Sequence, residues 1–132
     1  IEYRSAVAAH NLATVYRDQG YFDKAFEFYH KAYELSEVPS IELAYCHYFG
    51  IGTLKRQDTA FHLFEMISKD QFEFGNTPHD IDQANYQLGI IYLEGELVER
   101  SIEKARHYFL LVNKDEDHEM ALTMLQIVGK SD

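Results

Sequence analysis

The sequence predicts an all-α fold: an α-α superhelix (solenoid) of antiparallel helix hairpins, with about seven helices in a single domain over residues 1–132. One pattern of apolar, small and aromatic residues occurs three times at helical spacing. Hydrophobic residues make up 46% of the chain and proline only two positions, a composition typical of a folded domain. No apolar run approaches the ~20 residues of a membrane-spanning helix, so we expect no membrane span.

Each repeated unit has an apolar-small pair, a ring residue three positions after the small one, a glycine turn, and a second run of small, aromatic and aliphatic residues. Spacings of three and four keep such residues on one helical face, so each unit predicts two amphipathic helices. The small residues let the two backbones approach, and the glycines reverse the chain at low cost. The three sets are Leu12, Ala13, Tyr16, Gly20, Ala25, Tyr29 and Ala32; Leu43, Ala44, His47, Gly50, Gly52, Ala60, Phe64 and Ile67; and Leu88, Gly89, Tyr92, Gly95, Ala105, Phe109 and Val112.

The helix ends follow from turn and capping residues. Gly20 and Gly50 end the first and third helices, and Pro39 suits the first turn of the third, where a missing N–H costs nothing. Asp80 and the acidic run 115–117 suit helix starts, because carboxylates meet the positive end of the helix dipole there. The predicted helices span about 2–19, 22–36, 39–49, 57–70, 80–94, 101–113 and 117–129.

The connection between the second and third units is the longest. From Ile67 to Leu88 is 21 positions, and the turn-rich stretch 72–79 within it predicts an exposed loop. The segment 119–128 is similar to the first helix of a fourth unit, which either caps the array or continues it. The start at Ile1 indicates a piece of a longer protein. Localisation is therefore left open, with a soluble cytoplasmic protein favoured.

The turn lengths resemble those of a known superfamily. The ring residue and the small residue of the second helix are nine positions apart in the first unit and thirteen in the second and third. The short turn resembles a tetratricopeptide repeat, and the longer one, with Gly50 and Gly52, resembles its Sel-one-like subclass. His47 replaces the usual tyrosine, and Leu97 replaces the second turn glycine. The resemblance implies units near 6–37, 38–70 and 80–113, with a partial unit or cap at 117–129.

Charge and motif spacing exclude several functions. The net charge of −10 repels phosphate backbones, so we expect no nucleic-acid partner. Cys46 is the single cysteine, and no two histidines lie three or four positions apart, so neither a disulfide nor a metal site is predicted. We interpret His79, Asp80 and Asp82 as a capped helix start. The sequence shows no nucleophile paired with a base and no glycine-rich phosphate-binding loop. We therefore expect neither catalytic residues nor a cofactor.

The resemblance implies a concave groove lined by the first helix of each unit. Exposed aromatic residues in such a groove are typical anchors for a partner segment. The alternative is that rings such as Tyr45, Tyr48 and Phe49 are core between neighbouring helices. The groove positions carried over from the superfamily are Val7, His10, Thr14, Arg17, Ile41, Tyr45, Tyr48, Phe49, Gln83, Tyr86, Ile90 and Leu93.

The predicted function is a noncatalytic scaffold or adaptor that binds a peptide or protein domain in this groove. The cationic clamp with which some members of the superfamily hold a terminal carboxylate has no counterpart here, because its positions hold His10, Thr14, Glu42, Gln83 and Gln87. A basic or apolar-aromatic segment is therefore the favoured partner. Two alternatives stay open: a hydrolase-like activity on cell-wall or lactam substrates, and a purely architectural spacer. The sequence does not indicate an oligomeric state.

Overall fold

The computed structural model describes residues 2–70, 76–112 and 118–131, and within these ranges the chain forms helices and connecting turns with no strand. The all-α prediction with about seven helices is confirmed. The helices are α1 (Glu2–Asp18), α2 (Phe22–Ser36), α3 (Ile41–Phe49), α4 (Gln57–Ser68), α5 (Pro78–Glu94), α6 (Ile102–Leu111) and α7 (His118–Ser131).

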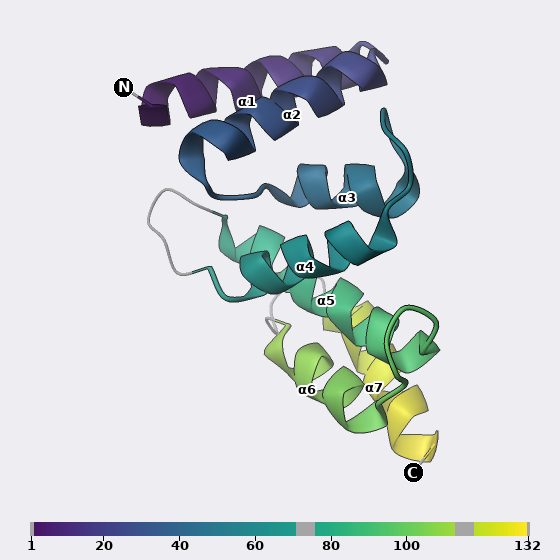
Figure 1. The fold of residues 1–132 in the computed structure, drawn as a ribbon. Helices are drawn as coiled ribbons and strands as arrows, with labels where there is room; N and C mark the ends of the chain where they lie inside the picture. The colour runs from purple at the N-terminus through teal and green to yellow at the C-terminus, as the bar shows by residue number, and fades with distance from the viewer. Residues whose placement is uncertain (1, 71–75, 113–117, 132) are drawn as a thin grey trace.

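Consecutive helices pack against one another from α1 to α7, and α3 also contacts α5. The pairs α1–α2, α3–α4 and α5–α6 form three hairpins that follow one another from the N-terminal end of the molecule to the C-terminal end (Figure 1). This is the arrangement expected of an α-α superhelix, in which each unit contacts mainly its neighbours. None of the described helices is long and apolar enough to cross a membrane.

Small residues lie where the two helices of a hairpin cross. Ala13, Ala44, Ala60 and Ala105 have no exposed surface, as the repeat pattern predicts. Gly89 takes the same role in α5, because a Cβ atom there would come within about 2.5 Å of the Phe109 ring. The crossings therefore have no room for larger side chains.

Two glycines of the turn after α3 have left-handed backbone conformations. Gly50 and Gly52 both have φ of 72°. Gly52 also lies so close to α2 that a Cβ atom would overlap the carbonyl oxygen of Phe22. The turn of the second unit is thus held against the first turn of α2. Leu97, which replaces the equivalent glycine in the third unit, instead packs half-buried against the main core.

Side-chain caps fix the starts of α3 and α5, and they correct one prediction. Ser40 accepts a hydrogen bond from the backbone N–H of Leu43, so α3 begins at residue 41 and Pro39 precedes the cap rather than lying in the first turn. Thr77 and Asp80 form a reciprocal capping box in α5, which confirms Asp80 at a helix start. The acidic run 115–117 lies outside the described residues.

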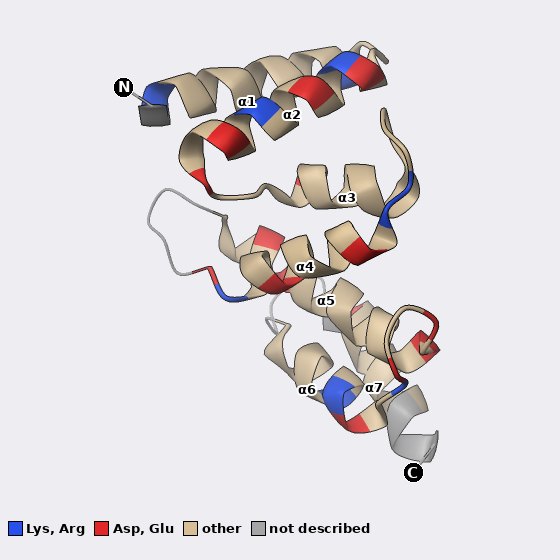
Figure 2. Cartoon of the chain, viewed as in Figure 1, with Lys and Arg blue, Asp and Glu red and all other residues tan. Residues whose placement is uncertain are grey.

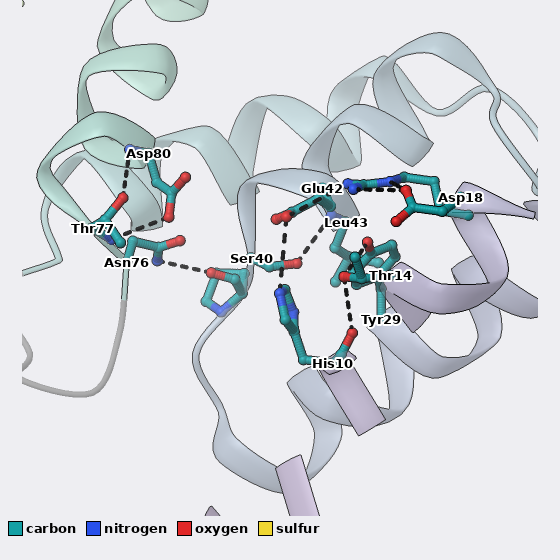
Figure 3. A network of polar contacts seen from close by, with 12 residues as sticks. His10, Thr14, Asp18, Tyr29, Ser40, Glu42, Leu43, Asn76, Thr77 and Asp80 are labelled. Carbon is teal, nitrogen blue, oxygen red and sulfur yellow. Dashed lines mark hydrogen bonds and ion pairs between the residues drawn. The ribbon is translucent and has the colours of Figure 1, made fainter. Parts of the chain in front are cut away.

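The predicted loop over 72–79 is shorter than expected at its C-terminal end, because α5 already begins at Pro78. Residues 71–75 lie outside the described part of the chain. Asn76 is half-buried: its backbone N–H donates to Asp70 Oδ2 at 2.7 Å, and its side chain donates to the Pro39 carbonyl at 2.9 Å. The segment is therefore tied to the start of α3 where it enters α5 (Figure 3).

Candidate functional site

Three hollows lie side by side along the first helices of the units. An N-terminal hollow of about 240 Å³ lies between α1, α2 and the starts of α3 and α5. A central hollow of about 400 Å³ lies between α2, α3 and the turn that follows α3. A C-terminal hollow of about 500 Å³ lies between α5 and the start of α7. Tyr29 and Glu42 line both the first and the second, and Tyr45 and Gln83 line both the second and the third, so we call the three together the groove.

The central hollow is apolar. Phe22 is 47% exposed and Phe49 is 55% exposed, and Ile51 and Tyr45 lie in the same lining. The Tyr45 and Phe49 rings stack with centroids 5.8 Å apart. Because Gly52 holds the turn against α2, residues from two successive units form one exposed apolar surface.

Polar side chains converge at the junction of the N-terminal and central hollows (Figure 3). Glu42, in the first turn of α3, lies 3.9 Å from His10 Nε2 and 3.9 Å from Arg17 Nη1. Arg17 also pairs with Asp18 at 3.3 Å. The Thr14 hydroxyl lies 3.0 Å from the Tyr29 hydroxyl, which joins α1 to α2. These contacts place a carboxylate, rather than a free cation, at the centre of the groove.

A second polar group lies where the central and C-terminal hollows meet. The Tyr45 hydroxyl donates to Gln83 Oε1 at 2.7 Å, and Gln83 Nε2 lies 2.7 Å from His79 Nε2. Burial is the main cause that raises the pKa of Tyr45 to about 12; the negative charges of Asp80 and Glu42 act in the same direction, and a hydrogen bond with Gln87 opposes them. Tyr45 therefore remains a neutral hydrogen-bond donor at physiological pH.

The structure places the predicted groove residues in two groups. Tyr48 lines a separate hollow beside Glu94 and Glu96, and its ring contacts the buried Phe64. Ile41 is buried in the main core, and Ile90 and Leu93 pack around the buried cluster of Phe109. Seven of the predicted residues line the three hollows: Val7, His10, Arg17, Tyr45, Phe49, Gln83 and Tyr86. The five that do not line them are Thr14, Ile41, Tyr48, Ile90 and Leu93.

Sequence reasoning did not identify several groove residues, because they lie outside the first helices of the three matched units. Phe22 begins α2 and Ile51 belongs to the turn after α3, and Met120 lies in α7. The signal that could have found the first two is the second turn glycine. A glycine in the middle of that turn indicates a close backbone approach, and the approach brings Ile51 beside Phe22.

Two groups in or beside the groove that could act as nucleophiles, the Cys46 thiol and the Thr14 hydroxyl, are not activated. Cys46 lines the central hollow, but burial raises the pKa of its thiol to about 11, the opposite of what a reactive thiolate needs. The Thr14 hydroxyl donates to the backbone carbonyl of His10, one turn earlier in its own helix, rather than to the imidazole. Among the described residues, no group of three or more His, Cys, Asp or Glu is placed to hold a metal ion.

Comparison with protein-family models identifies the repeats. The Sel1 repeat matches residues 6–37, 41–70 and 82–111, which together cover more than half of the chain. The chain belongs to the Sel1 repeat family. Sel1 repeats are generally protein–protein interaction modules and are typically noncatalytic. Comparison of this Sel1-repeat chain with curated proteins and with solved structures found no match.

Proposed function

We propose that this Sel1-repeat chain is a noncatalytic adaptor that binds a peptide or a protein domain in the groove. One observation carries the proposal: three hollows share lining residues, so they offer a partner one continuous surface with exposed aromatic side chains at its centre. Continuous apolar surface rimmed by polar groups is typical of docking sites on proteins.

The energetics favour Phe49 as the anchor of such a complex. Phe49 keeps more than half of its surface exposed, whereas Tyr45 packs against the buried Phe64 and is bonded to Gln83. Covering apolar surface is worth about 25 cal/mol per Å², so a partner gains most by covering the more exposed ring. Replacing Tyr45 would also break its hydrogen bond to Gln83, which makes Phe49 the better test position. Tyr86 is the second test position, and because its ring contacts the buried Phe109 the folding of its variant is measured separately.

The test is selection of binders from a library of displayed random peptides, with the full chain as the bait. We expect selected peptides to lose about five-fold or more in affinity for Phe49→Ala and for Tyr86→Ala, a cost above ~1 kcal/mol. Leu110→Ala is the matched control, because Leu110 is 60% exposed on α6 and lines none of the three hollows. Circular dichroism melting confirms that each variant is folded.

Unchanged peptide affinity in the two variants would contradict the proposal. If every selected peptide binds Phe49→Ala and Tyr86→Ala as tightly as the parent chain, the groove is not the docking surface. A selection that yields no binder at all favours the architectural spacer instead. The hydrolase-like alternative receives no support from the site, because neither the Cys46 thiol nor the Thr14 hydroxyl is activated.

A further inference from the structure

Resting on the proposed function, we propose that the partner is an extended segment in which lysine or arginine residues flank a bulky apolar residue. The apolar side chain occupies the central hollow beside Phe49. The cationic side chains enter the N-terminal and C-terminal hollows on either side.

The distribution of charge is the first observation. The two central first helices, α3 and α5, carry the carboxylates Glu42, Asp80, Asp82 and Glu94, and neither helix contains lysine or arginine. Lysine and arginine lie on α1, α2 and α6 and in the turns (Figure 2). The part of the groove that α3 and α5 line is thus acidic, whereas α1 contributes Arg17 to the lining and the other faces of the same units carry both signs of charge.

The lining residues themselves repeat this asymmetry. Within the described part of the chain, Glu42 and Asp80 line the N-terminal hollow, and Asp82 and Glu119 line the C-terminal hollow. Arg17 is the single lysine or arginine in the lining of the three hollows as described, where it pairs with Glu42 and Asp18, so carboxylates outnumber cations in the lining. An anionic segment would be repelled along the whole groove, whereas a cationic one gains at both ends.

The shape of the N-terminal hollow suits a long cationic side chain. Its walls include Val7, Val38 and Pro39, and its carboxylates Glu42 and Asp80 come from the starts of α3 and α5. Lysine and arginine combine an apolar stem with a charged end, so they can cover such walls and still reach a carboxylate. A purely apolar side chain would leave the carboxylates facing apolar surface, at a cost in desolvation.

The C-terminal hollow combines aromatic rings with carboxylates. Tyr45, Tyr86 and Met120 line it together with Asp82 and Glu119. A cation above a tyrosine ring is attracted by the negative face of the ring, and a nearby carboxylate adds to this attraction. Burial is the main cause of the raised pKa of the Tyr45 hydroxyl, and the charges of Asp80 and Glu42 also raise it, so their negative potential reaches the middle of the groove.

The experiment uses the same displayed library and the full chain. We expect groove-dependent peptides to be enriched in lysine or arginine on both sides of a leucine, phenylalanine or similar residue. One selected peptide is then synthesised in two forms, with lysine at those positions and with norleucine, which keeps the stem and removes the charge. Fluorescence anisotropy measures the affinity of each form for the parent chain and for the double variant Glu42→Gln, Glu119→Gln.

We expect the affinity of the lysine peptide to be about five-fold or more lower for the double variant than for the parent chain. The affinity of the norleucine peptide should differ less than two-fold between them. The matched control is Glu27→Gln with Glu99→Gln, which removes the same charge from exposed positions on α2 and in the turn after α5. That control should leave the affinity of both peptides within two-fold of the parent value, because distant exposed charges are screened.

The outcomes separate the two proposals. The selection could yield neutral or acidic peptides that bind the Phe49→Ala and Tyr86→Ala variants more weakly than the parent chain. That result would overturn the proposal of a cationic partner and would still support the groove as the docking site. Equal losses on the groove variant and on the control variant would also overturn it, since they would reflect net charge alone. Peptides indifferent to Phe49→Ala and Tyr86→Ala would overturn both proposals.

Discussion

At the scale of single residues, His47 differs from its counterparts in the other units. Its ring is 9% exposed, contacts Phe26 edge-on at 5.3 Å, and buries Nδ1 without a hydrogen-bond partner. Tyr16 and Tyr92 hold the same position and stack on Phe28 and Tyr108. An imidazole that must stay neutral has therefore replaced a ring that does not titrate near neutral pH.

The first prediction concerns the pH dependence of stability. Burial lowers the pKa of His47 below its usual 6.5, and the charges of His30 and Arg56 lower it further, against an opposing effect of Asp58. The unfolded chain therefore binds the proton more readily than the fold does, so this contribution to stability is present above pH 6.5 and is lost as the pH falls below it. His47→Tyr should lose less stability between pH 7.5 and pH 5.5 than the parent chain, as measured by urea unfolding.

His62→Gln is the control for this prediction, because His62 is exposed on α4. Other titrating groups contribute equally to the parent chain and to each variant. A difference in how the free energy of unfolding changes with pH therefore comes from the substituted histidine. If His47→Tyr and the parent chain show the same pH dependence, the imidazole is not held neutral by the fold.

At the scale of elements, the hairpin crossings give the second prediction. Ala60→Leu or Ala105→Leu places three extra carbon atoms at a crossing with no exposed surface, so each should lower the free energy of unfolding by about 1–3 kcal/mol. Ala8→Leu is the matched control, since Ala8 is exposed on α1. Urea unfolding measures all three variants, and equal stability of the crossing variants and the control would contradict the assigned crossings.

The third prediction separates two roles of glycine. Gly20 and Gly52 both have positive φ, but a Cβ atom at Gly20 meets nothing within 4 Å, whereas one at Gly52 overlaps the carbonyl of Phe22. Gly20→Ala should cost about 1–2 kcal/mol from backbone strain alone. Gly52→Ala should lower the free energy of unfolding by more than Gly20→Ala does, as measured by thermal or urea unfolding. It should also weaken the binding of groove-dependent peptides. Equal costs would show that the turn does not depend on its contact with α2.

The helices themselves could be predicted from the sequence because their signals are local. Spacing of three and four, small residues and turn glycines all act within one hairpin. Pro39 was misplaced because proline at a first helical turn and serine at a cap are both start signals, and here they are adjacent. Ser40 takes the cap, where its side chain satisfies the Leu43 N–H, so the proline is left outside the helix.

The groove was harder to predict, because it depends on contacts between units. The repeat pattern assigns Ile90 and Leu93 a face relative to their own hairpin, but it does not indicate that both side chains pack, half-buried, against the cluster around Phe109. In the same way, nothing in a helical period brings Phe22 beside Ile51. That pairing comes from the position of a turn against a neighbouring helix.

At the scale of the whole molecule, contacts run mainly between neighbours, which gives the fourth prediction. The C-terminal cluster joins α6 and α7 through Phe109, Val112 and Ala121, and it is separate from the main core. Removing residues 118–132 should therefore lower hydrogen-exchange protection in α5 and α6 while leaving α1 and α2 nearly unchanged. A uniform loss of protection from α1 to α6 would indicate that the chain unfolds as a single cooperative unit.

The central hollow also has a mechanical consequence, because its two walls belong to different repeat units. Phe22 moves with the first hairpin and Phe49 with the second, so the distance between them follows the bend of the superhelix at that joint. A segment seated there ties the two hairpins together, and its affinity depends on how far the joint is opened. If the proposed groove holds a partner segment, stretching the chain along its axis should weaken the binding of that segment, because it separates the two walls of the central hollow.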